Sequence, residues 1–250
     1  MTLPVDTIRY VLFDGATSPR NALELWQAAT GGGMPEGFQQ GAFPGAPAVA
    51  NGRLGKYRAT LATQPGRIEL AIAELVVPDA ADPTAPVAHI TDAQAAMARG
   101  LSATRKLLSN IDLNRLAIVV DSSESFSDSE SAVARMLRDL SFLNPPTGTI
   151  DLTYHVNNRV FSRSVPSIQI NRLCRWATAS RQVLQFEIGG GGSSAPRSHV
   201  VSSVPVYTVA YDVNTVAFDV RLTQAQRKAL LDDVSEQVGQ LLARGYEFLG

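Results

Sequence analysis

Two patterns of apolar residues divide the first half of the chain into strands and helices. Alternating or mostly apolar runs predict strands, and apolar residues that recur every three to four positions predict helices. Ser18 followed by Pro19 is typical of a helix start, because serine caps the helix and proline is tolerated in its first turn. The predicted elements are strands at residues 8–13, 57–63 and 67–77 and helices at residues 19–29 and 92–108.

The second half begins in the same way but then shows only strand patterns for about seventy residues. Ser127 and Glu130 have the spacing of a capping box before its first helix. A long amphipathic run closes the chain, with Leu230, Val234 and Val238 on one seam. The predicted elements are strands at residues 116–120, 150–156, 168–176, 182–188 and 201–212 and helices at residues 128–140 and 224–248.

A short segment recurs before the last helix of each half. Residues 90–94 read ITDAQ and residues 222–226 read LTQAQ, so that a threonine can cap each helix while a glutamine three positions later reaches back. We therefore divide the chain into residues 1–111 and 112–250, two similar halves of one compact unit. The recurrence indicates either a duplication or two helix starts of a common type.

The order of elements predicts an α+β fold. Consecutive strands favour antiparallel sheet with helices packed on one face, in two similar β-α-β-β-α halves with extra strands in the second half. If the halves repeat one structure, their sheets can join edge to edge, which would cover an exposed edge of each. Residues 31–55 hold eight glycines and three prolines without periodicity, so we interpret them as one long loop.

Composition narrows the class of protein. The chain is 45% hydrophobic and 18% charged, which is enough apolar sequence for a buried core. Its formal net charge of -1 does not favour attraction of the whole molecule to nucleic acid or to a membrane. The single cysteine, Cys174, excludes an internal disulfide framework. We expect a cytoplasmic protein of bacterial type that does not interact with membranes.

No set of residues predicts catalysis, a cofactor or a metal. Residues 121–125 (DSSES) resemble the D-x-S-x-S start of the metal site of von Willebrand A domains, but strands rather than alternating helices and strands are predicted to follow. We interpret them as a polar loop. His155 and His199 form a conceivable acid and base pair, although isolated surface histidines are much commoner. Cys174 has apolar neighbours and is expected to pack in the core.

The most suggestive patch is rich in arginine. Five arginines face only Asp151 and Glu187 within residues 150–188, with aromatic residues between them. Such a sheet face can pair with phosphates and stack on bases, as single-stranded RNA binders do. The alternative is that these arginines are solvated or paired with acids of the last helix, residues 232–236. The candidate residues are Arg159, Arg163, Arg172, Arg175, Trp176 and Arg181.

Three functions follow as hypotheses from these patterns. The leading one is a non-enzymatic protein-interaction or structural subunit of a larger assembly, or a homo-oligomer, that contacts its partner through Phe38 and Phe43 in the stretch 31–55. The alternative is a protein that binds RNA or single-stranded nucleic acid, with or without hydrolysis. A small-molecule pocket between the sheet and the last helix is compatible with the same fold. We expect any specific site in the second half.

Overall fold

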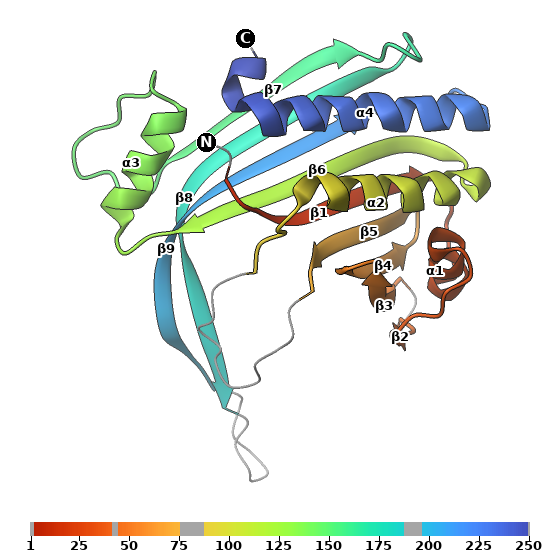
Figure 1. Ribbon diagram of the computed structural model, residues 1–250, viewed down its shortest axis with the longest axis horizontal. Helices are drawn as coiled ribbons and strands as arrows, with labels where there is room; N and C mark the ends of the chain where they lie inside the picture. The colour runs from red at the N-terminus through yellow and green to blue at the C-terminus, as the bar shows by residue number, and fades with distance from the viewer. Residues whose placement is uncertain (1–2, 42–44, 76–87, 188–196, 250) are drawn as a thin grey trace.

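The computed structural model describes residues 3–41, 45–75, 88–187 and 197–249 (Figure 1). The first half comprises β1 (Val5–Asp14), α1 (Ala22–Thr30), β2 (Gly37–Gln39), β3 (Ala48–Leu54), β4 (Tyr57–Gln64), β5 (Arg67–Glu74), α2 (Ala93–Leu107) and the 3₁₀ turn η1 (Leu108–Asn110). The second half comprises β6 (Leu113–Ser125), α3 (Ser129–Asp139), β7 (Thr153–Phe161), β8 (Gln169–Glu187), β9 (Arg197–Thr215), α4 (Gln224–Arg244) and η2 (Gly245–Phe248).

All nine strands form one antiparallel sheet in the order β2-β3-β4-β5-β1-β6-β9-β8-β7. Helix α1 packs on β3 and β4, α2 on β1 and β5, α4 on β6 and β9, and α3 on β8 and β9 (Figure 1). The predicted α+β class, with helices on one face of an antiparallel sheet, is confirmed. No helix within the described residues is long and apolar enough to cross a membrane.

The two halves share one connectivity. Each runs strand, helix, three strands and helix, and the first half adds only the short edge strand β2. Outward from the centre, β5, β4 and β3 follow β1 on one side, and β9, β8 and β7 follow β6 on the other. The halves meet where β1 pairs with β6, so the expected edge-to-edge joining of two sheets is confirmed.

The strands differ from the prediction in several places. Within the described residues the second half has four strands against five in the first, so it has no extra strands. The stretch 31–55 is not one long loop, because it contains β2 and β3, and Ala48 and Ala50 are buried in the core. The many glycines in this stretch were the reason that no strand was predicted. Gly52 is nevertheless required in β3, because a Cβ there would lie 2.7 Å from Cζ2 of Trp26. In the second half, the predicted strands 168–176 and 182–188 are one strand, β8.

The two recurring segments, residues 90–94 and 222–226, cap their helices in different ways. Thr223 and Gln226 form the predicted capping box of α4. In the first half the cap is Asp92, whose carboxylate accepts from the amide of Ala95, while Thr91 donates to Glu74 instead. Aspartate is a better cap than threonine, which explains the choice of Asp92 over Thr91. Asn21 caps α1 and Asp128 caps α3, rather than the predicted Ser18 and Ser127.

Helix α2 packs closely on the sheet at Gly100. A Cβ on Gly100 would lie 2.2 Å from Cε2 of Tyr10 on β1 and 2.7 Å from Cδ1 of Ile72 on β5. The Tyr10 hydroxyl donates a 2.7 Å hydrogen bond to the carbonyl of Met97, one turn earlier. The absence of a side chain at position 100 therefore sets the distance between α2 and the centre of the sheet.

A pair of glycine substitutions tests this close packing. Gly100→Ala should lower the free energy of unfolding by about 1–3 kcal/mol, because the methyl group overpacks the core. Gly239→Ala in α4, where a Cβ would meet nothing within 4 Å, should raise it by about 0.5–1 kcal/mol through helix propensity. Urea unfolding of both variants measures the difference; equal effects would contradict the described contact.

Candidate nucleic-acid interface

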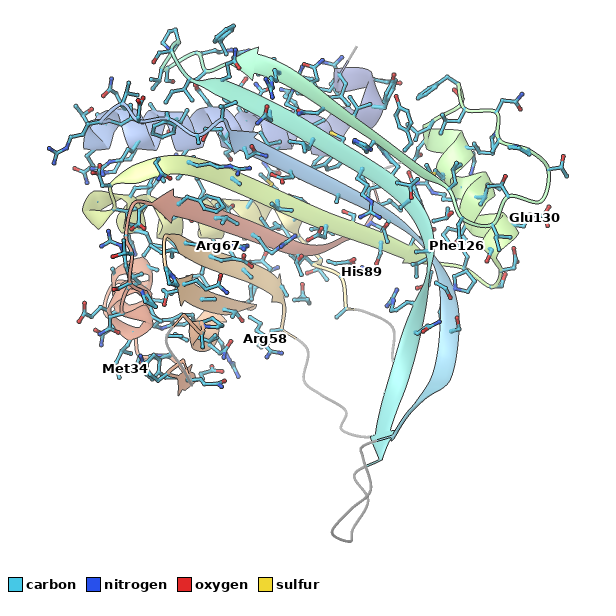
Figure 2. All side chains as sticks on the ribbon, turned by 180° about the vertical axis from the view of Figure 1, so that it is seen from behind. Met34, Arg58, Arg67, His89, Phe126 and Glu130 are labelled. Carbon is cyan, nitrogen blue, oxygen red and sulfur yellow. The ribbon has the colours of Figure 1, made fainter. Side chains whose placement is uncertain are left out.

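One face of the sheet lies opposite the helices, and we call it the open face. Strand residues alternate between the two faces, so Ile8 and Tyr10 of β1 are buried under α2 whereas Arg9 points the other way. Cross-strand partners share a face, which extends this assignment across the sheet. Figure 2 looks onto the open face, where Arg58 and Arg67 are labelled.

The open face carries a surplus of positive charge. Among the described strand side chains whose face the pairing fixes, eight arginines point to it against three carboxylates, Glu69, Asp121 and Asp212. Asp6, at the bulge of β1, pairs with His89. The four helices with their N-cap residues carry eight basic and eight acidic side chains and are balanced. The near-neutral total charge therefore hides a basic sheet face. The eight residues are Arg9, Arg53, Arg58, Arg67, Arg115, Arg159, Arg175 and Arg181.

Three of the eight arginines pair with carboxylates. Arg9 lies 2.9 Å from Asp121, which also accepts a hydrogen bond from Thr7. Arg53 pairs with Glu36 at the β2 edge, and Arg67 pairs with Glu69. The other five form no ion pair with any described residue, and two of them, Arg58 and Arg175, also form no hydrogen bond with the described residues.

A ladder of amide side chains holds two of these arginines against the sheet. Arg159 on β7 donates to Asn171 on β8 at 2.8 Å, and Asn171 donates to Asn214 on β9 at 3.0 Å. Arg115 on β6 donates to the same Asn214 oxygen at 3.2 Å. Because the acceptors are neutral amides, both guanidinium groups are positioned without being neutralised.

Aromatic and small residues complete this surface. The ring of Phe13 lies between two guanidinium groups, 5.2 Å from Arg115 and 6.0 Å from Arg67. Phe161, at the end of β7, is 62% exposed. Small residues form the floor between the charged side chains: Ala62, Ala71, Ala73, Ala117, Ala177, Ala179 and Ala210.

One row of cross-strand partners shows how far the charge extends. It runs from Arg58 on β4 through Ala73, Thr7, Asp121 and Ala210 to Arg175 on β8. Five steps between strands separate the two unpaired arginines, which corresponds to about 24 Å at a spacing of about 4.8 Å. A flexible polyanion can contact both arginines while it lies across the shallow floor.

The six residues that the sequence singled out lie in three places. Arg159, Arg175 and Arg181 lie on the open face, and Arg181 donates to Ser125 at 3.1 Å. The other three candidates lie away from this face.

Arg172 and Trp176 are 7% and 2% exposed on the helix side of the sheet, so they are not part of the open face. Arg172 instead donates to Asn158 and stacks on Phe248, 4.7 Å from the ring, which holds the C-terminal turn. Arg163 pairs with Glu236 on α4, as the alternative interpretation expected for such arginines.

Sequence reasoning missed the arginines of the first half. Arg9, Arg58 and Arg67 each alternate with buried residues on their strands, and that alternation was the available signal. The prediction considered only residues 150–188, where arginines are clustered in sequence. The basic face instead draws on both halves of the chain, which become neighbours only through sheet pairing.

The remaining candidate residues do not come together as a catalytic group. His155 pairs with Arg175, whereas the backbone of His199 pairs with Gln185, ten residues further along β8. This separation is about 33 Å in an extended strand. Cys174 is buried, as predicted, and burial raises the pKa of its thiol to about 12, although nearby Arg172 opposes the shift. The thiol is therefore protonated and shielded at neutral pH.

Phe38 lies on the edge strand β2 and is 46% exposed, and Met34, which precedes this strand, is 68% exposed. Phe43 lies outside the described residues. Residues 121–125 are the end of β6 rather than a polar loop, and Asp121 is held by Arg9.

A scan against protein-family models finds no match to this chain, and a search of the curated proteins finds none either.

Proposed function

We propose that this protein binds RNA or other single-stranded nucleic acid on the open face of its sheet. The observation that carries the proposal is the surplus of eight arginines over three carboxylates on a face that no described helix covers. Phosphate contacts by arginine supply most of the affinity in such complexes. The helices are balanced in charge, so a polyanion is attracted to one side of the molecule.

The arrangement suits a single strand. Guanidinium groups at Arg58, Arg115 and Arg175 are available for phosphates because no described carboxylate neutralises them. Phe161 and the guanidinium planes offer surfaces on which bases stack. The alanine floor lets an extended chain approach the sheet, whereas a rigid duplex would meet the arginines first.

A charge-neutralising double variant tests the proposal. Arg58→Gln with Arg175→Gln should weaken binding of mixed-sequence single-stranded RNA, because two phosphate contacts are lost. The slope of log affinity against log salt should also fall by about 1.4, since each contact contributes about 0.7 for single strands. Filter binding of a labelled 20-nucleotide pool at several salt concentrations measures both quantities.

The matched control removes two arginines from the helix side. Arg105 and Arg163, with side chains 43% and 75% exposed, pair with Asp232 and Glu236, so Arg105→Gln with Arg163→Gln changes the net charge equally. This control should retain the affinity and the salt slope. No retention of RNA by the wild type at low salt, or equal losses in both double variants, would rule the proposal out.

A protein-interaction role is the second candidate, and exposed apolar residues at the β2 edge favour it. Met34 and Phe38 are both exposed beside a three-residue edge strand whose outer backbone groups have no strand partner among the described residues. Phe38 also borders a hollow of about 800 Å³ at the start of α1, lined by Asn21 and Pro65. A partner strand with an apolar side chain would fit this edge.

Phe38→Ser tests this second role. A pull-down from a cell lysate should recover a specific protein with the wild type and lose it with Phe38→Ser. Ile150→Ser is the control, because Ile150 is 62% exposed but lies just before β7, the opposite edge strand. Recovery of the same proteins by all three chains would show that the β2 edge is not a docking site.

A further inference from the structure

A cavity on the helix side of the sheet lies between the end of α3 and the end of α4. Its volume is about 580 Å³, within the range of about 300–1,000 Å³ that is typical of sites for small molecules. Ser122 on β6, Trp176 on β8 and Tyr211 on β9 line its floor. The cavity is on the opposite side of the sheet from the open face, so it is independent of the proposed nucleic-acid binding.

Three polar groups on the floor have no hydrogen-bond partner among the described residues. They are the Ser122 hydroxyl, the Trp176 indole N–H and the Tyr211 hydroxyl. The three residues are 4%, 2% and 8% exposed, in that order. None of these three atoms is fully enclosed, so a ligand in the cavity can reach them. Desolvation raises the pKa of Tyr211, with Cys174 and Asp139 adding to the shift, so its hydroxyl keeps its proton and can donate. All three groups on the floor can therefore donate a hydrogen bond to a ligand.

Aromatic rings form one wall of the cavity. Tyr246 packs 6.0 Å from Trp176 and 4.7 Å from Phe142, measured between ring centroids. All three residues line the cavity, and Phe142 is 51% exposed at its mouth. Flat rings in this arrangement favour a planar ligand, because aromatic groups prefer offset or edge-to-face contacts with one another.

Two arginines without an ion pair lie at the rim of the cavity. Arg138 and Arg244 line it and form no ion pair with a described residue. The carboxylates of Glu247 and Asp139 also line it. Arg135 pairs with Asp139 at 2.5 Å and with Glu124 at 3.1 Å, and Asp139 accepts from the Tyr207 hydroxyl at 3.0 Å. The guanidinium groups of Arg138 and Arg244 are therefore the groups of the rim that can pair with a ligand carboxylate.

We propose that this cavity binds a small aromatic carboxylate with a hydrogen-bonding substituent on the far side of its ring. The carboxylate pairs with Arg138 and Arg244 at the rim. The ring lies against Trp176 and Tyr246, and the substituent accepts hydrogen bonds from Ser122 and Tyr211 on the floor.

Isothermal titration calorimetry with three related probes tests each part of this site. The probes are 6-hydroxy-2-naphthoate, 2-naphthoate without the hydroxyl group, and 2-naphthol without the carboxylate. The first should bind at one site, and each of the other two should bind about tenfold more weakly. A phosphate or other non-aromatic anion should not compete.

Two variants separate the rim from the floor. Arg138→Gln with Arg244→Gln should weaken both naphthoates about tenfold and leave 2-naphthol unchanged. Ser122→Ala, which removes one oxygen atom, should reduce the preference for the hydroxylated probe, because one of its two hydrogen-bond donors is lost. Arg105→Gln with Arg221→Gln is the control of equal charge, because neither arginine lines the cavity.

Three results would overturn this inference. They are no binding of 6-hydroxy-2-naphthoate at about 1 mM, equal affinity for 2-naphthol, and equal affinity in the rim variant and its control. Near-ultraviolet circular dichroism of each variant checks that Trp176 and its neighbours keep their packing. RNA binding should be unchanged in the rim variant. A failure of the naphthoate experiments therefore does not contradict the proposed RNA binding, and a failure of RNA binding does not contradict the ligand site in the cavity.

Discussion

The antiparallel pairing of β1 with β6 is the interaction on which the rest of the structure depends. It joins the two halves of the chain into one nine-stranded sheet. Since both strands belong to the same sheet, the side chains of each half alternate in phase with those of the other. All four helices then cover one face, and the arginines of both halves share the other. A shift of one residue at this junction would place the arginines of one half under helices.

The open face remains basic because its arginines are positioned without being neutralised. Neutral amides at Asn171 and Asn214 accept from Arg159 and Arg115, and the Phe13 ring lies between two guanidinium groups. Amides and rings orient a guanidinium group but leave its net charge in place. Carboxylates in place of Asn171 and Asn214 would hold Arg159 and Arg115 in the same way but would neutralise their charge, so that neither arginine would attract an anion.

The sequence contained the architecture but only part of the site. Periodicity located the helices and most strands, because burial of one face determines which residues are apolar. It failed at residues 31–55, where Gly52 serves close packing against Trp26 rather than a loop. It also placed Arg172 and Trp176 on the candidate surface, because clustering along the chain does not reveal which face a residue takes. Arg58 and Arg175 share one face of the sheet only because of the strand order.

The central claim is that single-stranded nucleic acid lies across the open face. Ultraviolet crosslinking of the protein to RNA that contains 4-thiouridine, followed by mass spectrometry of the crosslinked peptides, measures this contact directly. The account predicts crosslinks on strands β1, β4, β5, β6 and β8, at open-face residues such as Phe13 and Arg175, and none on α2 or α4. Crosslinks confined to the helices, or none at low salt, would contradict it.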